Sequence, residues 1–186
     1  MASKMKPLEV EISQGIETLC SLVILDNPDV DDVRRPTTKE DMYLHYDLIV
    51  EMKNGREIKV DVKGLKSLGH GRVKTGEYHW IETKNVSGAK GWLYGQADVI
   101  SFQVDEYDFI HVKRKDLVKL TENLIASMED KVVHRTSPTD FAERYVGKRI
   151  FTRDNPALPP NMRRYDNTIL VKTELLKTIA SNPFKI

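Results

Sequence analysis

Asp47, Asp61 and Lys63 are the residues of this chain whose types and spacing best suit chemistry. Asp61 and Lys63 alternate on one predicted strand, so their side chains point to the same face of a sheet. Asp47 lies on the preceding predicted strand, and we expect it directly opposite Asp61. Like charges opposite each other destabilise a sheet. A divalent metal ion between the two carboxylates would remove that repulsion.

The apolar residues around these side chains predict how the two strands pair. Each strand carries three apolar residues at alternate positions, one set before an Asn-Gly pair and one after it, which is typical of a β-hairpin. A two-residue turn would place the two sets on opposite faces. A three-residue loop, from Lys53 to a left-handed Gly55, pairs Leu48 with Val60 and keeps one apolar face. This register brings the two aspartates together.

An amphipathic helix is predicted upstream of the hairpin, over residues 7–24. Its apolar residues recur at helical spacing, and they are Leu8, Ile12, Ile16, Leu19 and Val23. Glu9 and Glu11 flank this stripe, from which a carboxylate could reach the edge of a sheet, whereas Glu17 points away from it. Either flanking acid also suits a solvated first turn, where the helix dipole favours negative charge.

A basic, glycine-rich loop, residues 64–76, follows the second strand of the hairpin. It holds no acidic residue. Glycines make such a loop adaptable, and lysine and arginine side chains attract phosphate. The candidate substrate-binding residues here are Lys66, His70, Arg72 and Lys74. The alternative is a solvated linker, which needs no ligand.

Glu82 and Trp92 are two further candidates in the middle of the chain. Glu82 suits contact with a metal or substrate, or else a hydrogen bond at the edge of the core. Trp92 suits stacking on a base, or else filling the core. Strands are predicted over residues 78–82, 97–104, 109–112 and, at a sheet edge, 168–171, and a helix is predicted over 115–128.

The composition is that of an ordinary globular protein. The 186 residues include 29 basic and 28 acidic side chains, so net charge alone does not predict a nucleic-acid partner. The single cysteine, Cys20, excludes a disulfide framework and suits a reducing cytoplasm; we expect it to be a buried small hydrophobe on the helix. No apolar run is as long as a membrane span, so we expect a soluble cytoplasmic protein without a membrane partner.

Asp47, followed on the next strand by Asp61-Val62-Lys63 and preceded by an acidic helix, resembles the PD-(D/E)XK nuclease superfamily. The proline that gives this superfamily its name is absent, because Tyr46 precedes Asp47. Residues 80–98 are also similar to small nucleases of this type from phages and bacteria.

The resemblance implies an α/β fold with a restriction-endonuclease-like core, in which helices flank a small mixed β-sheet. It covers roughly residues 8–128. We therefore expect a nuclease core over residues 1–130. Residues 131–186 are expected to form a helical and loop extension that packs on this core.

The resemblance also implies the roles of the site residues. A magnesium or manganese ion would be held by Asp47, Asp61, the main-chain carbonyl of Val62, and either Glu9 or Glu11. Lys63 would be the catalytic lysine. The protein would be a DNA endonuclease, with DNA favoured over RNA, in a bacterial or phage-infected cell. Because cutting both strands usually needs two active sites, a homodimer is one expected assembly.

Two other functions are consistent with the sequence. The first is a nucleic-acid-binding module on the same fold that lacks catalysis. Nothing in that function requires two aspartates and a lysine on one strand face. The second is an interaction protein whose acidic loop, residues 26–41, binds a partner.

Overall fold

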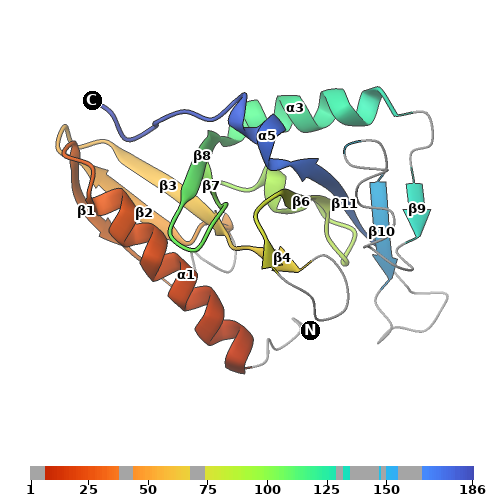
Figure 1. The fold of residues 1–186 in the computed structure, drawn as a ribbon, viewed down its shortest axis with the longest axis horizontal. Coiled ribbons are helices and arrows are strands. Elements are labelled where there is room, and N and C mark those ends of the chain that lie inside the picture. Colours follow the sequence, from red (N-terminus) through yellow and green to blue (C-terminus); the bar gives the residue numbers. More distant parts are fainter. Residues whose placement is uncertain are drawn as a thin grey trace.

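The computed structural model describes residues 7–37, 44–67, 74–128, 132–134, 147, 150–154 and 165–186. Two sheets form most of the structure (Figure 1). The five-stranded sheet contains, in spatial order, β1 (Val30–Arg34), β2 (Leu48–Met52), β3 (Glu57–Lys63), β7 (Val99–Gln103) and β8 (Phe109–Lys113). The four-stranded sheet contains β6 (Tyr78–Lys84), β11 (Tyr165–Lys172), β10 (Ile150–Asp154) and β9 (Val132–His134). β4 (Lys66–Ser67) and β5 (Lys74–Thr75) form a small separate hairpin.

The helices are α1 (Pro7–Leu25), α3 (Arg114–Ala126), α5 (Thr173–Lys177) and the 3-10 helix η1 (Trp92–Tyr94). α1 packs against β1 and β3, and α3 packs against β8 and η1. Figure 1 shows α1 and α3 in separate places, at different margins of the molecule. No helix in the part of the chain that the structure describes is long and apolar enough to cross a membrane.

The five-stranded sheet is mixed. β1, β2 and β3 run antiparallel, β3 pairs with β7 in parallel, and β7 turns back into β8. This small mixed sheet with flanking helices confirms the expected α/β fold class. Parallel neighbours require a long crossover connection. Here the crossover from β3 to β7 carries β4, β5, β6 and η1, so it delivers one strand to the second sheet.

The hairpin has the predicted register. Leu48 pairs with Val60, and Gly55 closes a three-residue loop with a φ of +80°. The backbone N–H of Asp47 donates to the carbonyl of Val60 at 2.8 Å. Continuing this register by one residue places Asp47 opposite Asp61, as the alternation of apolar residues predicts.

The sheet separates two apolar cores. Cys20 and Ile24 of α1 are buried, as expected for the cysteine, and they pack with Leu48, Val50 and Val60 on one face. The other face packs against α3, η1 and the second sheet, and its fully buried residues include Ile81, Leu93, Ile100, Phe102 and Leu117.

The predicted orientation of α1 is wrong in its second half. Val23 was expected on the buried stripe, but its exposed fraction is 37%. Cys20 and Ile24 are buried instead, and the Glu17 side chain, expected to point away, is only 16% exposed. Residues 19–25 are apolar almost all round the helix, so spacing alone does not identify the face that packs.

The last third of the chain contains more strand than expected. β11 was predicted as an edge strand, but it lies between β6 and β10. Its consecutive residues Ile169, Leu170 and Val171 are all fully buried, which is typical of an internal strand. The division of the chain into a core and an extension at residue 130 stays a prediction.

Two glycines provide a matched test of the hairpin loop. Gly55→Ala should lower the free energy of unfolding by about 1 kcal/mol, because its φ of +80° suits glycine and disfavours an L side chain. Gly15→Ala, inside α1 and with open space around the position, should raise it by roughly 0.5–1 kcal/mol. Denaturant unfolding of both variants measures the two changes, and equal shifts would contradict the left-handed loop.

Candidate catalytic and metal site

The Asp61 carboxylate is the centre of the site. It is 3% exposed, and its Oδ1 accepts a hydrogen bond from the Lys63 ammonium at 2.6 Å. Its Oδ2 is buried and has no hydrogen-bond partner among the described residues. Asp47 lies at the start of β2, where its Oδ2 accepts the backbone N–H of Val62 at 2.6 Å. The structure therefore brings together the three residues that the sequence analysis places first.

The electrostatics of this group are those of partly buried charges. Burial raises the pKa of Asp61 to about 7; Lys63 opposes this increase and the Asp47 carboxylate adds to it. Burial alone would lower the pKa of Lys63, but Asp61 and Asp47, with a smaller effect from Glu82, raise it overall. Lys63 therefore remains an ammonium ion, while Asp61 gains and loses its proton near neutral pH.

The second sheet contributes Glu82 and, through the loop that follows β6, Trp92. The Lys63 Nζ lies over the Trp92 ring, 4.5 Å from its centroid. Glu82 Oε2 accepts the backbone N–H of Trp92 at 3.3 Å. Burial raises the pKa of Glu82, against the opposing effect of that hydrogen bond. Trp92 is partly buried and packs with the core, which was one of its two predicted roles, and its ring contacts Lys63.

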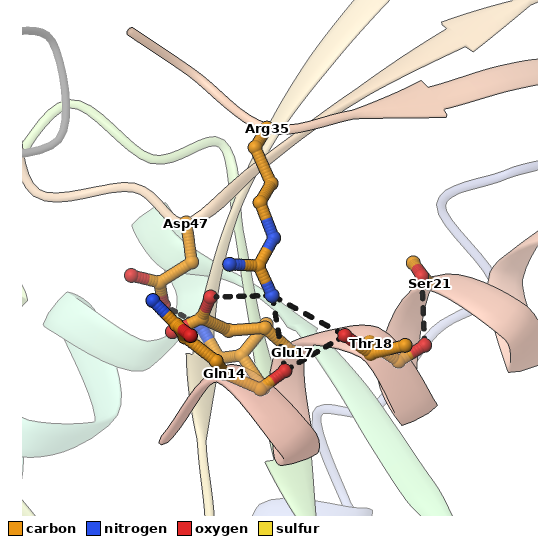
Figure 2. Close-up of polar contacts among 7 residues, drawn as sticks. Gln14, Glu17, Thr18, Ser21, Arg35 and Asp47 are labelled. Atoms are coloured by element: carbon orange, nitrogen blue, oxygen red, sulfur yellow. Dashed lines mark hydrogen bonds and ion pairs between the residues drawn. The ribbon is translucent and has the colours of Figure 1, made fainter. Parts of the chain in front are cut away.

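Glu17 is a largely buried carboxylate on α1, and sequence reasoning placed it away from the packed face. Figure 2 shows Glu17 and Gln14 of α1 in the same view as Arg35 and Asp47. Arg35, just after β1, forms an ion pair with Glu17 at 3.3 Å and donates to the Gln14 carbonyl at 3.0 Å. The signal was available in the spacing, because Glu17, Cys20 and Ile24 recur every three or four residues on one helix face.

The other predicted site residues lie outside what the structure describes in detail. Glu9 and Glu11 belong to α1, but their side chains are outside the described part. Lys66 and Lys74 belong to β4 and β5, which pair with each other, and their side chains are likewise outside it. His70 and Arg72 fall in residues 68–73, outside the described residues. Their roles as substrate or metal contacts stay predictions.

The oxygen atoms of Asp61 and Asp47 are of the type that a hard divalent cation prefers. The unpartnered Asp61 Oδ2 is a buried oxygen that lacks a donor within the described residues, and Asp47 supplies a second carboxylate beside it. Carboxylate and carbonyl oxygens are the ligands that magnesium and manganese prefer. Among the described residues, however, no three histidine, cysteine, aspartate or glutamate side chains are already grouped to hold a metal ion.

Known proteins offer limited guidance for this chain. No protein-family model matches the sequence, and no curated protein matches it. A solved structure described as "The structure of a bacterial homing endonuclease: I-Ssp6803I" is similar to the chain, with a TM-score of 0.39 and 19% sequence identity. The similar part covers 57% of this chain and 69% of that chain. With similarity this low, function has to be argued from the residues themselves.

The raised pKa of Asp61 predicts how stability depends on pH. The folded state holds the Asp61 proton up to about pH 7, whereas an ordinary aspartate loses it near 3.8. Wild type should therefore lose stability relative to Asp61→Asn as the pH rises through this window, by an amount on the order of 4 kcal/mol at most. Denaturant unfolding of both proteins across the window, without divalent metal, measures the difference. Parallel stability profiles would contradict the buried, proton-holding carboxyl.

Proposed function

We propose that the protein is a metal-dependent nuclease that hydrolyses phosphodiester bonds, with DNA as its substrate and internal positions as its sites of cleavage. The observation that carries the proposal is the Asp61 carboxylate, buried beside Asp47, bonded through one oxygen to Lys63 and unpartnered through the other. A cation at the free oxygen would offset the repulsion between the two carboxylates, as the Lys63 ammonium does at the bonded oxygen. The preference for DNA over RNA rests on the superfamily resemblance.

Different residues would have different roles in phosphodiester hydrolysis. Asp47, Asp61 and the Val62 carbonyl would hold a magnesium or manganese ion. A bound ion of this kind acidifies water and offsets negative charge on the phosphate. The Lys63 ammonium stabilises the charge that gathers on the phosphoryl oxygens in the transition state. Its side chain is 23% exposed, which leaves it accessible to a substrate.

Glu17 takes the role that the resemblance gives to a helix carboxylate. Its side chain is 16% exposed, and its ion pair with Arg35 fixes its orientation (Figure 2). Oriented carboxylates next to a metal site strengthen binding by adding negative charge and by holding water or ligand side chains.

Substitution of the two central residues tests the enzymatic function. Asp61→Ala and Lys63→Ala should each lower the rate of plasmid cleavage in manganese by at least about a hundredfold, because they remove a metal ligand and a transition-state charge. Lys59→Ala, on the same strand face, and Asp32→Ala, on β1, should retain activity. Circular dichroism controls for folding.

The same assay separates the proposal from a binding module without catalysis. Plasmid, single-stranded DNA and RNA are each incubated with wild type in magnesium and in manganese. Cleavage of none of them, together with retained binding of a DNA fragment, would favour the non-catalytic module. Full cleavage by both Asp61→Ala and Lys63→Ala would overturn the assignment of the site.

Metal affinity tests Glu17 without reference to cleavage. Glu17→Ala should weaken manganese binding by about tenfold or more, since it removes a carboxylate and leaves Arg35 unpaired near the ion. Titration of free manganese by electron paramagnetic resonance measures the affinity directly. Leu22→Ala, on the same helix and 59% exposed, is the control. Equal affinities for Glu17→Ala and wild type would remove Glu17 from the site.

A further inference from the structure

Lys63 is held on two sides by groups from two elements, β3 and the 3-10 helix η1. Its own strand supplies Asp61, whose Oδ1 lies 2.6 Å from the ammonium. The segment after β6 supplies the Trp92 ring, whose centroid lies 4.5 Å from the same nitrogen. A cation within roughly 6 Å of an aromatic ring is attracted by the negative charge of the ring face. A lysine side chain is flexible, so the contacts with Asp61 and Trp92 are needed to hold its ammonium group in one position.

The Trp92 ring is itself held rigidly. It packs edge-on against Phe102, with centroids 6.4 Å apart and an interplanar angle of 62°. Phe102 is fully buried and is the register partner of Lys63 across the parallel pair of strands. The ring therefore rests on the core beneath the strand that carries Lys63, and it cannot swing out without disturbing that packing.

Hydrogen bonds and close packing fix the loop between β6 and Trp92, and so fix the position of the Trp92 backbone. The Asn85 Oδ1 accepts the backbone N–H groups of Ser87 at 3.0 Å and Ala89 at 3.1 Å, which folds the loop back on itself. Gly91 then passes so close to β6 that a Cβ there would lie 2.4 Å from the Glu82 carbonyl oxygen. The next backbone N–H, that of Trp92, donates to the Glu82 carboxylate. Glu82 thus anchors the main chain that carries the ring.

We propose that Trp92 is a positioning residue for Lys63, with its ring holding the ammonium group against Asp61, and that Glu82 acts by anchoring Trp92. This inference rests on the proposed function of Lys63 in phosphodiester hydrolysis. It gives Glu82 the role of a hydrogen-bond acceptor, in place of contact with metal or substrate. It also explains why a tryptophan beside the site is packed with the core.

Kinetics of Trp92 variants are the first test. Trp92→Leu should lower kcat for DNA cleavage by about tenfold with little change in KM, because Lys63 acts in the transition state. Trp92→Phe keeps a ring and should lose less than about threefold. Tyr94→Leu is the matched control: its ring lies on the same 3-10 helix, and Lys90 lies over it at 5.4 Å. Equal losses in Trp92→Leu and Tyr94→Leu would overturn the proposal.

Fluorinated tryptophan separates electrostatics from packing. The chain has two tryptophans, so Trp80→Phe leaves Trp92 as the one site of incorporation. Fluorine weakens the negative ring face while nearly preserving shape, so kcat should fall stepwise with each added fluorine. A constant kcat across the series would show that the ring acts by bulk alone. The test also covers the case in which Trp92→Leu fails to fold.

Glu82 is tested by two substitutions. Glu82→Gln keeps an acceptor oxygen for the Trp92 N–H but removes the charge that a metal ligand would need. Glu82→Ala removes both. An anchoring role predicts that the Gln variant loses several-fold less kcat than the Ala variant. Equal losses would assign Glu82 to metal or substrate and overturn its part of the proposal.

A measurement without substrate keeps this inference distinct from the nuclease proposal. The methylene protons next to the Lys63 nitrogen should show an upfield ring-current shift in the NMR spectrum of wild type. That shift should vanish in Trp92→Leu and persist in Tyr94→Leu. Its presence without DNA cleavage would refute the nuclease proposal alone. Cleavage by wild type without the shift would refute the positioning role alone.

Discussion

The ion pair between Lys63 and Asp61 is the interaction on which the rest of the site depends. Both groups leave water, which costs several kcal/mol for each charge unless a partner compensates. The 2.6 Å contact with Lys63 provides that compensation for one oxygen of the Asp61 carboxylate. The nearby Asp47 carboxylate repels negative charge on Asp61, so it favours the protonated form of Asp61. The neighbouring groups also offset the cost of burying these charges. The Trp92 ring lies over the ammonium, Glu82 on the neighbouring sheet is a further acid near it, and a backbone N–H donates to Asp47. A buried pair of this kind contributes chiefly to function, because apolar side chains of similar volume would give the folded protein as much stability or more.

The fold meets the constraint by placing the pair where two sheets meet. β3 supplies Asp61 and Lys63, and its parallel neighbour β7 is reached only by a long crossover. In many α/β proteins such a crossover is a helix. Here it also carries a strand of the second sheet, so the polar face of the hairpin is covered by Glu82 and Trp92 instead of by water.

The sequence predicted the hairpin well and the elements around it less well. The alternation of Leu48, Val50 and Met52 with polar residues leaves a single register with one apolar face, and that local rule holds in the structure. The face of α1 could not be predicted in the same way, because residues 19–25 are apolar on nearly every side. Packing against the sheet determines which face of α1 is buried, and it buries Cys20 and most of the Glu17 side chain. The contact between Lys63 and Trp92 joins residues that no local pattern connects, so tertiary structure alone reveals it.

The pairing of β6 with β11 affects when the surroundings of Lys63 can form during synthesis of the chain. Glu82 pairs in register with Thr168, so the strand that carries Glu82 is stabilised by a segment that is synthesised well after it. The hairpin that carries Asp47, Asp61 and Lys63 is local in sequence and can form early, whereas distant strand pairing is slow. During translation the acidic pair and its lysine therefore exist before the environment that orders them. We expect a chain on the ribosome that does not yet include β11 to hold Asp47, Asp61 and Lys63 without their final arrangement.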